Sequence, residues 1–227
     1  MIVVYHHLGL GDHIDCNGMV RYFAELYGDE TIEIFAKKNY HTMVEYMFRD
    51  HDRINVNLIE SDEQSEVAQF VVANQPAEFF KIGHEHYPPN PSPTKNCWEY
   101  FYEQLDIDTN IKYDYFYVKP DKVQEKRVYN KLNPNNEEYI FVHEESSVGV
   151  FPFNLDTDMK IIRNDIDENI FHFTEILRKA KEIHVMESSY KSMVEHFPTE
   201  GKLFFHNLRE HPLGKTKKDW EIIEYAS

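Results

Sequence analysis

Short apolar runs alternate along the chain with longer stretches in which apolar residues recur every three or four positions. The first run, residues 2–5, is β-branched and aromatic, and the stretch 14–27 that follows has apolar residues at helical spacing. The first pattern is typical of a buried strand and the second of an amphipathic helix. Because such strands and helices alternate, the sequence predicts an α/β fold with mainly parallel sheets.

The same alternation places the remaining elements. It predicts strands at 31–36, 54–59, 79–83, 139–143, 160–163, 183–186 and 202–206, and helices at 40–48, 65–73, 98–105, 121–132, 170–180 and 190–196. The aromatic run 113–118 is expected to be extended, and a last helix is expected around Trp220. Four prolines in residues 87–93 predict a loop.

A strong breaker, Asn133-Pro134-Asn135-Asn136, follows the predicted helix 121–132. We therefore expect a domain boundary there. Residues 1–133 and 137–227 would each form a Rossmann-like half with its own parallel sheet, and the C-terminal half would be the smaller one.

Composition and charge narrow the function classes. Hydrophobic residues make up 41% and aromatic residues 15% of the chain, as expected of a folded protein. With 24 basic and 40 acidic side chains, the net charge of −16 disfavours nucleic acid and anionic membrane surfaces as partners. Two cysteines, Cys16 and Cys97, make no disulfide framework or Cys-x-x-Cys motif, and the opening apolar run is too short for a signal peptide or a membrane span. We expect a cytoplasmic protein.

The first candidate for chemistry is the loop His6-His7-Leu8-Gly9-Leu10-Gly11-Asp12. It follows the first predicted strand, at the sheet edge where open α/β folds bind ligands. It lacks the third glycine of a dinucleotide fingerprint, because Ile14 stands there. Asp12 has two readings: it caps the following helix, or it is a general base in the cleft.

Two further loops follow predicted strands in the second half. Ser188 and Ser189 stand where a helix begins, so they either bind a phosphate or simply cap that helix. His143 and Glu144 end the strand that opens this half. They either contact a phosphate or a base, or they are ordinary surface residues.

Metal and sugar-stacking sites have weaker signals. His84-x-His86 is expected in a strand with both side chains on one side, yet no third ligand is marked. Asp156-x-Asp158 resembles a metal-binding Asp-x-Asp but lies in a predicted loop of an acid-rich chain. The aromatic residues around Trp98 and Tyr113 either stack on a sugar or, more simply, pack in the core.

Together, the two main loops resemble bacterial heptosyltransferases and related GT-B glycosyltransferases, including short viral homologues. Leu10-Gly11-Asp12, followed by a helix with Arg21, is similar to the family's N-terminal Gly-Asp signature. The stretch 185–189 stands in the place of the family's Asp-Thr-Gly, with Glu187 for Asp and Ser188-Ser189 for Thr-Gly. Paired serines here are also similar to GT-B fucosyltransferases, so the donor sugar stays open.

The resemblance implies a metal-independent and inverting transfer of a sugar from a nucleotide diphosphate to a hydroxyl of a glycan or another acceptor. It implies no cofactor. Asp12 would be the base, the first half would bind the acceptor and the second half the donor. The implied ligand-binding residues are Gly11, Glu187, Ser188, Ser189, Lys191, Arg163 and Arg209 for the diphosphate, His143 and Glu144 for the nucleotide, and His6, His7, His13, His84 and His86 for the acceptor.

Two alternatives remain open. A GT-B-like module that binds a ligand without catalysis is consistent with the short second half. A metal-dependent GT-A transferase would use Asp156 and Asp158 instead.

Overall fold

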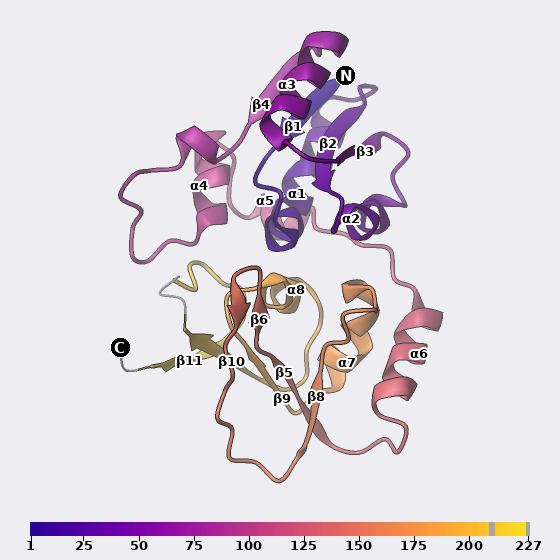
Figure 1. The fold of residues 1–227 in the computed structure, drawn as a ribbon, viewed down its shortest axis with the longest axis vertical. Coiled ribbons are helices and arrows are strands. Elements are labelled where there is room, and N and C mark those ends of the chain that lie inside the picture. Colours follow the sequence, from indigo (N-terminus) through magenta and orange to yellow (C-terminus); the bar gives the residue numbers. More distant parts are fainter. Residues whose placement is uncertain (209–211, 226–227) are drawn as a thin grey trace. The chain divides into compact units, whose positions relative to one another are not determined.

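The computed structural model of the chain describes residues 1–208 and 212–225. These residues divide into two compact units. The first comprises Met1–Ser92 and Cys97–Lys119, and the second comprises Pro93–Asn96 and the chain from Pro120 onward. Each unit is built on its own parallel sheet, as Figure 1 shows. The α/β fold with two Rossmann-like halves is therefore confirmed.

The first unit has a sheet with strand order β3-β2-β1-β4, in which all pairs are parallel. Its strands are β1 (Ile2–Tyr5), β2 (Ile32–Lys37), β3 (Ile54–Ile59) and β4 (Glu78–Lys81). Its helices are α1 (Leu10–Leu26), α2 (His41–Phe48), α3 (Glu63–Asn74), the 3-10 helix η1 (His84–His86), α4 (Cys97–Gln104) and α5 (Ile111–Asp114).

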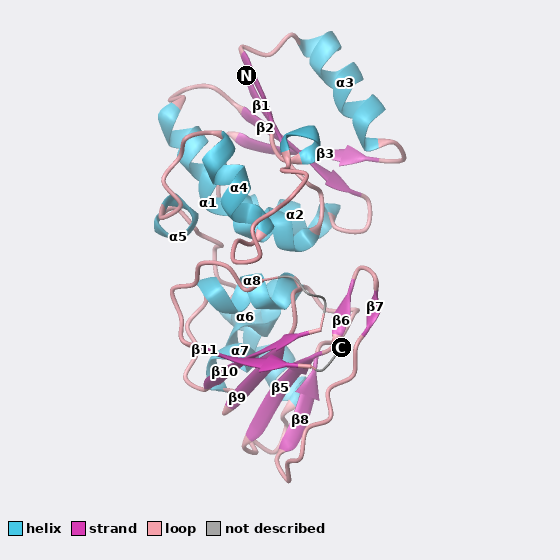
Figure 2. Cartoon of the chain, turned by 90° about the vertical axis from the view of Figure 1, so that its left-hand side faces the viewer, coloured by secondary structure: helices cyan, strands magenta, loops and turns pink. Residues whose placement is uncertain are grey.

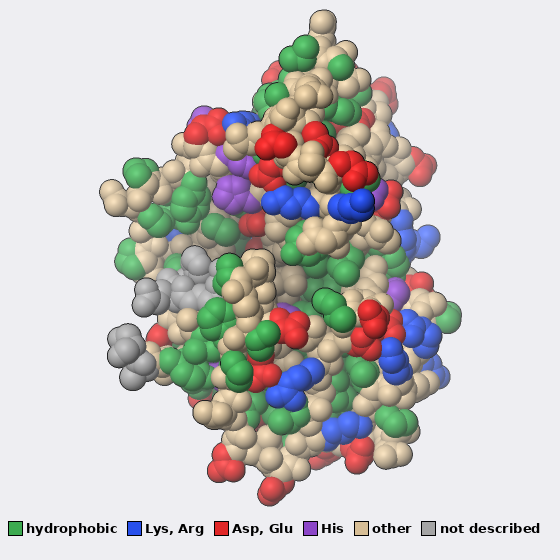
Figure 3. Space-filling view, viewed as in Figure 1, with side chains coloured by type: hydrophobic (Ala, Val, Ile, Leu, Met, Phe, Trp, Pro, Cys, Tyr) green, Lys and Arg blue, Asp and Glu red, His purple; other side chains and the backbone are tan. Residues whose placement is uncertain are grey.

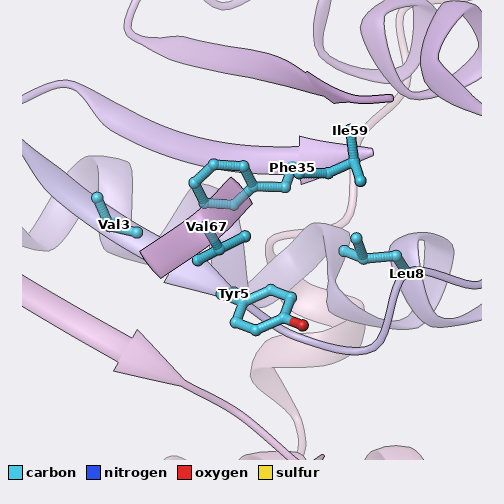
Figure 4. Packing of buried hydrophobic residues seen from close by; sticks show 6 residues of the cluster. All are labelled: Val3, Tyr5, Leu8, Phe35, Ile59 and Val67. Atoms are coloured by element: carbon cyan, nitrogen blue, oxygen red, sulfur yellow. The ribbon is translucent and has the colours of Figure 1, made fainter. Parts of the chain in front are cut away.

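Strand alternation divides the first core between two helical layers. Val3 and Tyr5 of β1 point to the face that α3 covers, where they pack with Phe35, Ile59 and Val67 (Figure 4). On the other face, Phe23 of α1 stacks on Phe80 of β4. Both faces of this sheet are thus covered by helices, and the carboxyl ends of its strands share one edge.

Helices α4 and α5 are fixed to α1 by close contacts. Gly18 of α1 lets α5 approach, because a Cβ there would lie 2.4 Å from the carbonyl oxygen of Ile111. The buried ammonium of Lys112 lies 2.8 Å from an Asp15 carboxylate oxygen, and Tyr102 of α4 donates its hydroxyl hydrogen to the Asp15 carbonyl at 3.0 Å. These contacts hold α4 and α5 against α1.

The expected extended run at 113–118 is wrong. Residues Ile111–Asp114 form α5, and the segment that follows has no regular structure up to Val118. Its backbone is held by a side chain instead of a neighbouring strand: the Asn17 amide accepts from the Tyr117 N–H at 3.0 Å and donates to the Tyr117 carbonyl at 3.3 Å.

The second unit has a parallel sheet with order β11-β10-β9-β5-β8 and a small antiparallel pair, β6-β7. Its strands are β5 (Tyr139–His143), β6 (Glu145–Ser146), β7 (Gly149–Val150), β8 (Lys160–Arg163), β9 (Glu182–Val185), β10 (Lys202–Asn207) and β11 (Trp220–Glu224). Its helices are α6 (Lys122–Leu132), the 3-10 helix η2 (Ile170–Phe173), α7 (Thr174–Lys179) and α8 (Ser189–His196).

The division between the units lies before α6, earlier than the breaker at 133–136. Helix α6 packs on the second sheet's helical layer, where the Tyr129 ring lies beneath the Lys179 ammonium at 4.1 Å and Arg127 pairs with Glu168. The breaker ends this helix, as expected, but the chain crosses between the units ahead of it.

The helices of the second unit lie on one face of its sheet (Figure 2). Phe141 of β5 points to them and packs on Phe173 and Tyr190. The opposite face carries Ile140, Val142 and Met186, and the irregular segment 151–159 covers it with Phe153 and with the partly buried Phe151, Leu155 and Met159.

The expected terminal helix around Trp220 is wrong, because this segment is β11 and pairs in parallel with β10. A chain of hydrogen bonds ties it in place. The Glu182 carboxylate can only accept, so His184 donates from Nε2 at 3.1 Å and accepts at Nδ1 from His206 Nε2 at 3.0 Å. The Tyr225 hydroxyl then donates to His206 Nδ1 at 2.6 Å.

Candidate functional site

Asp12 lies at the carboxyl edge of the first sheet, in the first turn of α1. The helix begins at Leu10 with Gly9 as its N-cap, so the expectation that Asp12 caps the helix is wrong. The carboxylate lies in the first turn, where unpaired backbone N–H groups favour negative charge. Its Oδ1 lies 3.7 Å from the Cys97 sulfur of α4. Gly11, expected to bind the donor diphosphate, is the second residue of the same helix.

Four of the five histidines expected to bind an acceptor lie together at this edge. The rings of His6 and His13 are 4.7 Å apart, and those of His7 and His84 are 4.8 Å apart. His86 lies in η1 with about half of its side chain exposed, and it makes no ring contact with the other four among the described residues. The expectation of a strand at His84-x-His86 is wrong, because positive φ angles at Gly83 (73°) and His84 (50°) turn the chain into η1.

Burial keeps this cluster neutral near pH 7. It lowers the pKa of His6 to about 4 and that of His13 well below its usual range, and it also lowers the pKa of His7 and His84. His6 donates from Nδ1 to the His7 carbonyl at 2.5 Å. His7 accepts the backbone N–H of His84 at Nε2 at 2.8 Å, so its proton is on Nδ1. The partly exposed His7 and His84 can donate to and accept from sugar hydroxyls, whereas the expectation that His6 and His13 bind an acceptor is wrong, because each is 1% exposed.

Sequence reasoning missed two charged residues at this edge. Lys37 ends β2 and pairs with Glu63 of α3 at 2.8 Å, and the Tyr5 hydroxyl donates to the same carboxylate at 3.3 Å. Both residues affect the pKa of His7, Lys37 lowering it and Glu63 raising it. Lys37 at the end of β2 and Glu63 in the first turn of the helix after β3 were a usable signal, because parallel strands bring their carboxyl ends to one edge.

In the second unit, Ser188 and Ser189 lie where β9 leads into α8. Ser188 is the N-cap but makes no side-chain capping bond, and its buried Oγ has no hydrogen-bond partner within 1–208 and 212–225. Ser189 is the first helical residue. The fully buried Lys191 directs its ammonium to the Leu213 carbonyl at 3.3 Å and to the Glu187 carboxylate at 3.7 Å. This turn thus combines the N-terminal N–H groups of α8, which have no acceptor within the helix, with the Ser188 hydroxyl.

His143 ends β5 at the same edge of the second sheet, and Glu144 follows it directly. His143 donates from Nδ1 to Asn164 Oδ1 at 3.1 Å, its ring packs on Tyr190, and burial lowers its pKa. Glu144 accepts the Phe153 N–H at 2.7 Å and the Arg163 Nε–H at 2.8 Å. The charge of Arg163, expected to bind a diphosphate, is therefore balanced by Glu144.

The other residues that the sequence singled out add no described contact to these two groups of residues. Arg209 lies outside the described residues. Asp156 and Asp158 are exposed in the loop before β8, and the described residues contain no group of three or more metal-ligating side chains arranged to hold an ion.

On the face that Figure 3 shows, basic side chains lie beside acidic ones. No helix in the described part of the chain is long and apolar enough to cross a membrane.

We compared the sequence and the structure with known proteins, and only the structure gave matches. No family model matches the sequence, and no curated protein matches it. The structure is similar to a glycosyl transferase family 9 protein from Veillonella parvula, with a TM-score of 0.61 and 9% identity over 98% of this chain and 85% of that one. It is also similar to the E. coli ADP-heptose lps heptosyltransferase II, with a TM-score of 0.61 and 8% identity over 98% and 90% of the two chains. The chain therefore has the fold of these transferases.

Proposed function

We propose that the chain is a glycosyltransferase that moves a sugar from a nucleotide diphosphate to a hydroxyl of a glycan or another acceptor. The observation that carries the proposal is the position of Asp12: it follows β1 in a fold that two sugar transferases share over 98% of this chain. In open α/β sheets, ligands bind at the carboxyl ends of the strands.

In this proposal Asp12 is the general base. It takes the proton of the acceptor hydroxyl while the oxygen forms a bond to the anomeric carbon of the donor. The bond from that carbon to the diphosphate breaks at the same time, so the configuration inverts. The partly exposed His7 and His84 bind and orient the acceptor hydroxyls from the same sheet edge, while the fully buried His6 and His13 help to position them. The first unit is thus assigned to the acceptor.

The second unit is assigned to the donor. The N–H groups at the N-terminus of α8 and the hydroxyls of Ser188 and Ser189 bind the diphosphate, and the buried Lys191, paired with Glu187, lies in the same turn. His143 lies at the same sheet edge, where the nucleotide is expected. These groups supply the charge stabilisation that a metal ion supplies in other transferases, so the reaction is proposed to be metal-independent.

Binding is tested first. Wild-type protein is heated with each of a panel of nucleoside diphosphates, and a ligand at about 100 times its dissociation constant should stabilise it by about 2.7 kcal/mol. A panel of nucleotide sugars is then assayed for release of nucleoside diphosphate, with and without EDTA. A shift without release identifies a non-catalytic binding module, and loss of release in EDTA identifies a metal-dependent transferase. No shift with any nucleotide contradicts the proposal.

Asp12→Asn tests the base. We expect it to lower turnover by roughly 10²- to 10⁴-fold, the typical contribution of a general base, while nucleotide affinity stays unchanged. Asp52→Asn, which changes an exposed carboxylate of the same unit, is the matched control and should leave turnover at the wild-type level. Near-normal turnover in Asp12→Asn would show that the base is another group.

A further inference from the structure

Gly9 lies directly beside the Asp12 carboxylate, and its backbone conformation does not require a glycine. Gly9 has φ −75° and ψ 149°, a conformation that any residue adopts. A Cβ at this position would nevertheless lie 2.6 Å from Asp12 Oδ2. The displaced atom would be the end of a short side chain, so the fold can tolerate the methyl group by turning the carboxylate away. Glycine at this position therefore serves the placement of the carboxylate.

The other carboxylate oxygen lies beside a thiol. Cys97 Sγ is 3.7 Å from Asp12 Oδ1, within range of a weak S–H···O hydrogen bond. Cys97 is the first residue of α4, and the next residue, Trp98, is fully buried beneath the Lys112 ammonium at 3.8 Å. Lys112 in turn pairs with Asp15 of α1, so the helix that carries the thiol is anchored to the helix that carries the carboxylate.

We propose that Gly9 and Cys97 are positioning residues for Asp12: Gly9 leaves the space that Oδ2 occupies, and Cys97 donates its S–H hydrogen to Oδ1. The catalytic consequence rests on the proposed function, but the contact itself does not. Cys97 is also, on this inference, the thiol through which an electrophile would disable the site, because a group added to its sulfur would take the space beside Oδ1.

The chain offers a clean reporter for this contact. Its two cysteines are Cys16 and Cys97, and Cys16 is fully buried while Cys97 is partly exposed. Burial, followed by the charge of Asp12, raises the pKa of the Cys16 thiol well above its usual range. Iodoacetamide should therefore alkylate Cys97 selectively: the thiolate sulfur displaces iodide, a carbon–sulfur bond forms, and the thiol proton goes to solvent.

The first arm measures alkylation rates by peptide mass spectrometry across a pH series and needs no sugar substrate. A nearby carboxylate disfavours the thiolate, so Asp12→Asn should raise the Cys97 rate at about pH 8 by about threefold or more. Glu103→Gln, which removes an exposed charge from the same helix, should leave the rate unchanged. Gly9→Ala should also raise the rate, and should have no effect in the Asp12→Asn background. Equal rates in wild type and Asp12→Asn would overturn the contact.

The second arm uses the nucleotide sugar that wild-type protein turns over. Gly9→Ala and Cys97→Ala should each lower kcat by about tenfold with donor KM and nucleoside diphosphate affinity unchanged, whereas Cys97→Ser, which keeps a donor, should recover most of kcat. The acid limb of the pH–rate profile should move to higher pH in Cys97→Ala, because the charged carboxylate loses a donor. Wild-type kcat in both alanine variants would overturn the positioning role. Failure of wild type to turn over any nucleotide sugar would contradict the proposed function and leave the first arm to decide the contact.

Discussion

Acidification should destabilise the first unit through His6. This residue is 1% exposed, and burial lowers its pKa from 6.5 to about 4. The unfolded chain therefore binds the proton first as the pH falls, so the stabilising effect is complete above about pH 6.5 and is lost toward about pH 4. Between about pH 7.5 and about pH 4.5, linkage gives a loss of about 2.5 kcal/mol in the free energy of unfolding from this residue alone.

Urea unfolding at the two pH values measures this loss. Trp98 belongs to the first unit and Trp220 to the second, so fluorescence in a Trp220→Phe background reports on the first unit. His6→Asn keeps an N–H donor close to Nδ1 but does not titrate, and it should lose about 2.5 kcal/mol less than its parent on acidification. His86→Asn, at a half-exposed histidine, should behave like the parent. If His6→Asn and its parent lose equal stability, His6 is not buried as a neutral group.

Three further predictions concern other contacts. Lys112→Met should lower the free energy of unfolding, measured in urea, by about 3–5 kcal/mol, because it leaves the Asp15 carboxylate buried without its cation. Adding Asp15→Asn should restore part of this loss, and no recovery would contradict the pairing. Gly18→Ala should destabilise the first unit by about 1–3 kcal/mol, since its methyl group meets the α5 backbone, and unchanged stability would show that α5 packs elsewhere. Replacing Ser188 and Ser189 together by Ala should weaken nucleoside diphosphate binding by about tenfold or more in calorimetry, whereas unchanged affinity would remove the phosphate site.

The sheets could be predicted from the sequence because each buried strand is a short apolar run between breakers. The hydrophobic pattern fails to predict the element type where tertiary contacts determine it. The segment Trp220–Glu224 has apolar residues that fit a helix or a strand, and only pairing with β10 selects the strand. In the run 113–118 the Asn17 amide satisfies the backbone of Tyr117, which no local pattern can reveal.

The candidate site was predictable to the extent that strand ends are predictable. His6, His7 and His84 follow β1 and β4, and the structure brings them to one sheet edge. Cys97 is 85 positions from Asp12 along the chain, and nothing in its local sequence marks it as a neighbour of that carboxylate. Its place depends on how α4 packs on α1. Tertiary contacts of this kind lie beyond any spacing rule.

The second sheet has helices on one face and the irregular segment 151–159 on the other. A helical layer keeps its own backbone ladder when one contact is lost, whereas an irregular segment has no such ladder. A single protease cut between Phe153 and Met159 would therefore expose the apolar side chains of Ile140 and Val142 to solvent. We expect the second unit to be degraded further after that cut. The first unit, whose sheet is covered by helices on both faces, would remain as a protease-resistant fragment.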